Sequence, residues 1–142
     1  MNGMKEAIQK IETAEADVEL RVTRRMEIGS AIQQGDVYVH RLPDNWKRGK
    51  LVAKGEVQIA VGQNVGARHV AIGNVEVYAG VALPPDVTAP MGIEAREICG
   101  PVIVAETAWA LQHPEHAHHR MPAGVYGVTY QYDPRTMRRV AD

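Results

Sequence analysis

GDVYVHRL, residues 35–42, is the stretch of the sequence that decides the fold class. The two sides of the segment alternate, with Val37, Val39 and Arg41 on one side and Asp36, Tyr38 and His40 on the other. A period of two residues is typical of a β-strand with one buried face, because successive side chains point to opposite faces of a sheet. The turn-forming segment PDNWKRG, residues 43–49, follows directly and is expected to be a loop.

The β pattern continues along most of the chain. Short apolar or alternating runs, separated by glycine and proline, predict strands over residues 18–23, 51–53, 56–61, 69–72, 75–79, 102–111, 125–132 and 137–140. Gly73-Asn74 predicts a two-residue hairpin turn, because glycine accepts positive φ and asparagine tolerates it. Residues 24–34 fit either a loop or a short helix. Short strands with glycine turns predict a mainly β fold, either an antiparallel sandwich or a small barrel.

One amphipathic helix is predicted near the N-terminus, over residues 4–16. Its apolar positions are three or four apart and form one stripe, made of Met4, Ala7, Ile8, Ile11 and Ala14. Because this stripe is narrow, the helix would be marginal alone and should lie against the domain or another subunit. Met4, Ile8 and Ile11 are therefore the expected contact residues of an interaction arm.

Composition and length predict one β-rich domain at 18–142, preceded by the helical arm at 1–17. The 142 residues are 45% hydrophobic and carry a formal net charge of -1, so no strong positive field favours nucleic acid. The single cysteine and the polar opening MNGMKEAIQK predict synthesis in the cytoplasm without secretion. No apolar run approaches the roughly 20 residues that span a bilayer, so no membrane association is expected.

Four of the six histidines lie within residues 113–119. Neutral imidazole is a good ligand for zinc and other transition metals, and a catalytic zinc site takes three protein ligands plus water. Pro114 can start a helical turn that places His113 and His116 on one side. His69, on an earlier strand, could supply the third ligand. The sequence thus offers His69, His113 and His116 as candidate metal ligands.

Two acids complete this hypothesis, because Glu115 or Glu56 could orient an imidazole or act as a base on metal-bound water. The HxxH spacing of His113 and His116, however, differs from the HExxH motif, which fixes two histidines and a base on one helical face. Two structural alternatives stand beside the metal site. The histidines could satisfy the backbone groups of a turn, or they could form a polar cross-strand cluster without catalysis.

Two blocks of the sequence, GARHV at 66–70 and HPEH with MPAGVYGV between 113 and 128, carry a resemblance. The chain resembles a small family of uncharacterised bacterial and bacteriophage proteins with Gly, a short gap, His, then His-Pro-Glu-His and Leu-Pro-Ala-Gly-x-Tyr-x-Val. Met121 stands in place of the leucine. Ala67 stands where many members carry another histidine, which removes one candidate ligand. The resemblance implies no established activity and is compatible with a phage setting.

Other catalytic chemistry finds little support. Ser30 is the only serine and lacks the strand-to-helix elbow of hydrolases. Cys99 has only Glu97 as a charged neighbour, which disfavours a reactive thiolate. GQNVGARH, residues 62–69, lacks the lysine-serine ending of a phosphate-binding loop.

Two functions follow from these observations. The first is a non-enzymatic β-rich structural or binding module, such as a phage virion or decoration-like accessory protein, which forms a homo-oligomer or joins a larger assembly. It requires no cofactor. The second is a small histidine-liganded metal-binding protein or metal-dependent hydrolase, with zinc or another transition metal. The first is favoured, because no complete catalytic set can be assembled from the sequence.

Overall fold

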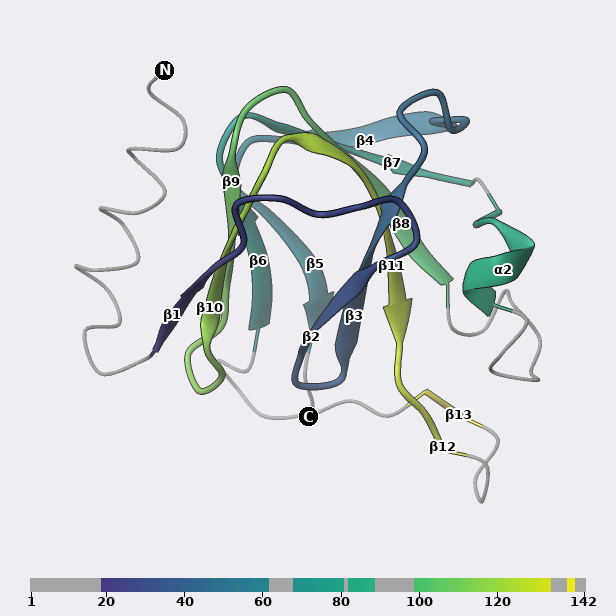
Figure 1. Cartoon of the computed structure of the whole chain (residues 1–142). Coiled ribbons are helices and arrows are strands. Elements are labelled where there is room, and N and C mark those ends of the chain that lie inside the picture. The colour runs from purple at the N-terminus through teal and green to yellow at the C-terminus, as the bar shows by residue number, and fades with distance from the viewer. Residues whose placement is uncertain (1–18, 62–67, 81, 89–98, 134–137, 140–142) are drawn as a thin grey trace.

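The computed structural model describes residues 19–61, 68–80, 82–88, 99–133 and 138–139. The described part is mainly β, as predicted, and its two large sheets do not close into a barrel (Figure 1). The predicted helical arm at 1–17, including Met4, Ile8 and Ile11, lies outside the described residues. Among the residues described, no helix is long and apolar enough to cross a membrane.

The larger sheets contain five and six strands. The five-stranded sheet has the order β1 (Leu20–Val22), β10 (His118–Met121), β9 (Trp109–Gln112), β6 (Arg68–Ile72) and β5 (Val57–Val61). The six-stranded sheet has the order β2 (Ala31–Gln34), β3 (Val37–Leu42), β11 (Gly124–Tyr130), β8 (Cys99–Ala105), β7 (Val75–Ala79) and β4 (Lys50–Lys54). A small ribbon pairs β12 (Tyr132–Asp133) with β13 (Arg138–Arg139), and α2 (Pro85–Thr88) is a single helical turn.

Both large sheets contribute to one apolar core. Its buried members are Val37, Val39, Ile59, Ala71, Val75, Val77, Ile103, Ala105, Trp109, Leu111, Met121, Tyr126 and Val128. Val37 and Val39 are fully buried, which confirms the inward face predicted for GDVYVHRL. A second cluster lies on the opposite face of the six-stranded sheet, where Leu83 and Trp46 pack against Val102 and Val104. Apolar side chains thus pack against both faces of this sheet.

The connection through Gly73 and Asn74 crosses from one sheet to the other. β6 belongs to the five-stranded sheet and β7 to the six-stranded sheet, so the predicted hairpin is wrong. Gly73 does have positive φ, at 135°, and a Cβ there would lie 3.2 Å from the Cβ of Trp109. The glycine is therefore required by the close approach of this corner to Trp109, and two strands that follow each other need not pair.

The single strand predicted over 102–111 is also wrong. It is divided by a bend at residues 106–108 into β8 and β9, which lie in different sheets. Ile103 and Ala105 before the bend and Trp109 and Leu111 after it all face the shared core. The alternation therefore continues across the bend, because a strand that folds over a core keeps the same side chains inward. Periodicity alone does not reveal such a corner.

The other predicted strands are present with shifted bounds, whereas the prediction of a loop or a short helix over residues 24–34 is wrong for its last four residues. The ambiguous segment 24–34 ends in a strand, β2, which pairs with β3 through the turn at Gly35 and Asp36. The strand predicted over 18–23 is reduced to β1 and runs parallel to β10. The four strands predicted between 51 and 79 correspond to β4, β5, β6 and β7, and that over 137–140 corresponds to β13.

Candidate functional site: a histidine cluster between the sheets

A buried polar link joins the two sheets at the end opposite the Gly73 corner. His69 is the second residue of β6, while Gln34 and Asp36 come from the end of β2 and its turn to β3. His69 and Asp36 are fully buried, and Gln34 is 1% exposed. The Nδ1 atom of His69 lies 2.8 Å from Gln34 Oε1, and its Nε2 atom lies 2.9 Å from Asp36 Oδ1. This link ties β6 to the β2–β3 turn at the lower end of Figure 1.

The orientation of the Gln34 amide fixes where the protons lie. Its Nε2 atom donates to the backbone oxygens of Leu111, at 3.0 Å, and Ala117, at 2.8 Å. Gln34 Oε1 is consequently an acceptor, so His69 Nδ1 must donate to it. A second proton lies between His69 Nε2 and the Asp36 carboxylate. Both ring nitrogens of His69 are thus engaged in hydrogen bonds.

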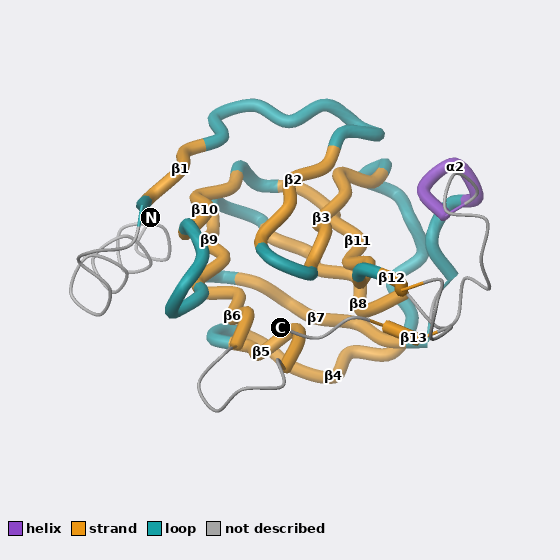
Figure 2. The backbone as a smooth tube through the Cα atoms, turned by 90° about the horizontal axis from the view of Figure 1, so that it is seen from below, coloured by secondary structure: helices purple, strands orange, loops and turns teal. Residues whose placement is uncertain are grey.

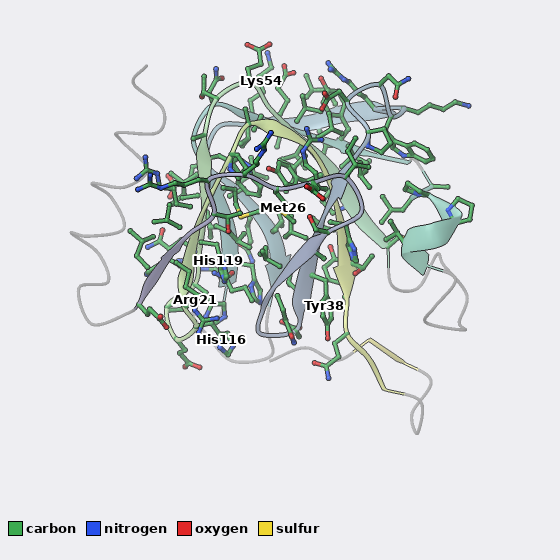
Figure 3. The ribbon with its side chains drawn as sticks, in the orientation of Figure 1. Arg21, Met26, Tyr38, Lys54, His116 and His119 are labelled. Atoms are coloured by element: carbon green, nitrogen blue, oxygen red, sulfur yellow. The ribbon has the colours of Figure 1, made fainter. Side chains whose placement is uncertain are left out.

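His113 and His116 approach this link from the loop between β9 and β10. The ring centroids of His69 and His113 are 4.4 Å apart, those of His113 and His116 are also 4.4 Å apart, and those of His69 and His116 are 6.4 Å apart. Figure 3 shows His116 at the lower end of the molecule. The structure therefore brings together the three histidines that the sequence offered as ligands.

Hydrogen bonds to the backbone also fix the tautomers of two histidines. His113 Nδ1 accepts from the backbone N–H groups of Glu115, at 3.0 Å, and His116, at 3.1 Å. His118 Nδ1 accepts from the backbone N–H of His113, at 3.3 Å. Each of these two rings therefore carries its proton on Nε2. The loop is held by its own histidines, as the structural alternative predicts.

Both acids that were predicted to assist the histidines, Glu115 and Glu56, are exposed. Glu115 is exposed, and its backbone N–H is the group that meets His113. Glu56 is exposed on the connection between β4 and β5. It precedes Val57, which pairs with Ala71, whereas His69 pairs with Ala60 farther along β5. Glu56 is thus at the far end of β5 from His69.

A metal ion requires nitrogen lone pairs, which these hydrogen bonds already occupy. Both nitrogens of His69 face Gln34 and Asp36, and the Nδ1 lone pair of His113 accepts two N–H groups. Within the ranges that the structure describes, no three His, Cys, Asp or Glu side chains are arranged to hold a metal ion. As arranged, the donor set fits a hydrogen-bonded link between sheets better than a metal centre.

Two further buried histidines lie outside the cluster. His40 Nε2 is 2.8 Å from Thr129 Oγ1, and burial lowers the pKa of His40. His119, which is 5% exposed, has a pKa lowered first by burial and then by the positive charge of Arg21. The side chains of His40 and His119 are therefore uncharged in the folded protein at neutral pH.

The Pro-Ala-Gly motif has a structural role. The hydroxyl of Tyr126 donates to the backbone oxygen of Pro122 at 2.6 Å, and Arg41 stacks 5.6 Å above the Tyr126 ring. Burial raises the pKa of Tyr126 to about 12. Gly124 has φ 153°, and a Cβ there would lie 2.6 Å from the Arg41 guanidinium. Residues that carry the family resemblance therefore anchor the turn that begins β11.

A different surface is formed by β4, the outermost strand of the six-stranded sheet (Figure 2). Leu51 is 40% exposed and Val52 is 54% exposed. The pairing with β7 shifts register between Leu51 and Ala53, so Val52 is the residue skipped by the ladder. A β-bulge of this kind redirects a side chain on a sheet edge. β4 thus combines an outer backbone edge with exposed apolar side chains.

Comparison of the chain with protein-family models, with curated proteins and with solved structures finds no match in any of the three. The resemblance carried by GARHV and HPEH accordingly stays a prediction.

Proposed function

We propose that the chain is a non-enzymatic β-rich binding module that joins a larger protein assembly, such as a phage virion, by pairing a sheet edge with a strand of another chain. The exposed apolar edge of β4 carries this proposal. At the histidine cluster, the side chains of His69, Gln34 and Asp36 are instead buried and hydrogen-bonded to one another. Synthesis in the cytoplasm, followed by incorporation into the assembly, fits this role.

β4 offers the two components of strand addition. Within the described residues it pairs with β7 alone, which leaves a row of backbone N–H and C=O groups along its outer side. Main-chain hydrogen bonds supply affinity when a peptide adds to such an edge, and pockets for side chains supply specificity. Burial of Leu51 and Val52 would add a favourable apolar contribution.

A photo-reactive amino acid, p-benzoylphenylalanine, placed at position 52 tests this function in the cells that naturally make the protein. We expect one cross-linked adduct of defined mass, with a partner chain that mass spectrometry identifies. The matched control carries the same group at Asp44, whose side chain is 78% exposed on the loop after β3. Absence of an adduct at position 52, or the same adduct at both positions, would remove β4 from the proposal.

The N-terminal arm is proposed as the element that joins copies of the chain. Deletion of residues 1–16, which include Met4, Ile8 and Ile11, should reduce the particle mass in light scattering while the circular dichroism of the sheets is retained. An unchanged mass would exclude the arm from self-association.

The second function, a metal-binding protein or metal-dependent hydrolase, is favoured by one observation. The ring centroids of His69, His113 and His116 are 4.4 to 6.4 Å apart, so the three rings are close enough to share one metal ion. The hydrogen bonds on the ring nitrogens of His69 and His113 oppose it, so metal binding would require the link to His69 to open. Its test is given with the predictions below.

A further inference from the structure

We infer that the outer face of the five-stranded sheet is the surface that receives the N-terminal arm, residues 1–17. The arm lies outside the described residues, and the observations that point to it are made on the sheet. The inference rests on the proposed function only where the arm joins two copies, and it adds the surface on which that contact is made.

The five-stranded sheet carries apolar side chains on the face that points away from the core. Trp109 and Leu111 of β9 lie in the core, so Ala110 between them points outward. On β10, His118 points outward too, because it lies three positions before the core residue Met121. Ala110 belongs to a separate cluster with residues of the neighbouring strands, namely Leu20, Val70 and Ile72. The sheet is therefore apolar on both faces, as expected of a layer packed between two others.

The middle of this outer face is buried. Ala110 and His118 are fully buried, and Ile72 is 5% exposed. Toward the edges of the sheet, in contrast, Gln58 of β5 is exposed and Val22 of β1 is 47% exposed. Burial thus extends over β10, β9 and β6, which span about 10 Å at about 4.8 Å between neighbouring strands. That width matches the diameter of about 10 Å of one α-helix with its side chains.

The described elements do not supply this cover. Within the described ranges, the apolar cluster on the outer face is made only of residues of the sheet itself. α2 packs through Val87 against the outer face of the six-stranded sheet instead. Figures 1 and 2 both show α2 on the other side of the molecule from β1 and β10. The cover therefore comes from a segment outside the described elements.

The N-terminal arm has the pattern and the point of attachment that this cover requires. Its predicted helix has one narrow apolar stripe that includes Met4, Ile8 and Ile11. The arm leads directly into β1, the edge strand beside β10. Residues 15–19 reach about 17 Å when extended, while β9 is about 10 Å from β1. The arm can therefore reach the middle of the face in its own chain or, by exchange, in a neighbouring copy.

Photo-cross-linking from the arm tests this surface on the full chain. p-Benzoylphenylalanine replaces Ile8 in one variant and Gln9, which lies outside the apolar stripe, in the matched control. We expect adducts with peptides of β6, β9 or β10 from position 8 and their loss from position 9. An equimolar mixture of unlabelled and ¹⁵N-labelled chains shows the origin of each adduct, because a cross-link between copies carries both labels.

A second measurement does not depend on cross-linking. The dye 8-anilinonaphthalene-1-sulfonate (ANS) fluoresces more strongly on exposed apolar surface. Deletion of residues 1–16 uncovers Val70 and Ile72, so ANS fluorescence should increase and its emission should shift to shorter wavelength. Ile8→Asp should have the same effect, whereas Gln9→Asp should leave the fluorescence unchanged.

Adducts confined to other surfaces, equal adducts from positions 8 and 9, or unchanged ANS fluorescence after the deletion would each overturn the inference. Adducts between copies would support both this surface and the role of the arm in self-association. Adducts within one chain, with an unchanged particle mass after the deletion, would retain the surface but remove the arm from self-association. A reduced mass without any adduct from position 8 would retain self-association and overturn the surface.

Discussion

His69 Nε2 lies 2.9 Å from Asp36 Oδ1, and this contact joins a strand of one sheet to a turn of the other. At the opposite end, the chain itself passes between the sheets, at Gly73 and again at residues 106–108. The two sheets are therefore connected covalently at one end and by a buried, hydrogen-bonded pair at the other. Several consequences of this arrangement can be measured.

Removal of the Asp36 carboxylate should destabilise the fold strongly. Asp36→Ala leaves the buried His69 ring without its charged partner, and loss of one member of a buried pair costs about 3–5 kcal/mol. Urea unfolding, followed by tryptophan fluorescence, measures this loss. Asp44→Ala is the matched control, because that carboxylate is 78% exposed beside Arg41 and contributes about 1 kcal/mol or less. Equal losses in the two variants would contradict the inter-sheet link.

The tautomers assigned from the hydrogen bonds can be observed by long-range ¹H–¹⁵N correlation spectra. We expect an unprotonated Nδ1 in His113 and His118 and a protonated Nδ1 in His69, because the first two accept N–H groups and the third donates to Gln34. Equimolar zinc, added to protein without a histidine tag, should leave these signals unchanged. Stoichiometric zinc that shifts the His69 and His113 signals and is lost in His116→Ala would establish the metal function instead.

Stability should fall as the solution is acidified. Burial lowers the pKa of His40 and His119 from the ordinary value of about 6.5, so the unfolded chain binds more protons than the folded one below that pH. The free energy of unfolding contributed by these two residues is therefore retained above about pH 6.5 and is lost progressively below it. Urea unfolding at several pH values should show a smaller loss in a His40→Gln, His119→Gln double variant. An equal loss in the variant and the wild type would contradict this assignment.

The corner at Gly73 should be sensitive to a single methyl group. Gly73→Ala places a Cβ 3.2 Å from the Cβ and 3.3 Å from the Cα of Trp109, in addition to the strain of its positive φ. Gly80→Ala is the control, because Gly80 has φ 81° and a Cβ there meets nothing within 4 Å. We expect a loss of about 2–3 kcal/mol for Gly73→Ala and about 1 kcal/mol for Gly80→Ala in urea unfolding. Similar losses would show that the contact with Trp109 is relieved by a small shift.

Individual strands could be predicted from the sequence, while their division between two sheets could not. Alternation reports only which side of a strand is apolar, and the same side stays inward when the chain folds over the core. Val75 and Val77 after the Gly73 corner face the same core as Ala71 before it. A hairpin and a corner between sheets therefore give the same alternation of apolar residues in the sequence. The missing information is pairing over long distances in the sequence, such as Val39 with Val128.

The candidate site was predicted in part. The proximity of His69 to His113 and His116 followed from strand ends that were expected to meet, and the ring spacing agrees. Gln34 and Asp36 were missed, because Asp36 lay on the polar side of an alternating strand and nothing local marked it as buried. A glutamine and an aspartate around the glycine of a tight turn are the only signal, and ordinary surface hairpins carry it too.

The place of β11 within the six-stranded sheet has a consequence for synthesis on the ribosome. β11 lies between β3 and β8, so it connects the β2–β3 hairpin to the group formed by β8, β7 and β4. Until residues 124–130 have left the exit tunnel, these two groups have no common strand, and the apolar faces of both stay accessible to other chains or to chaperones. Closure of this sheet must therefore wait for one late segment, and nascent chains that stop before residue 124 should be recognised as unfolded.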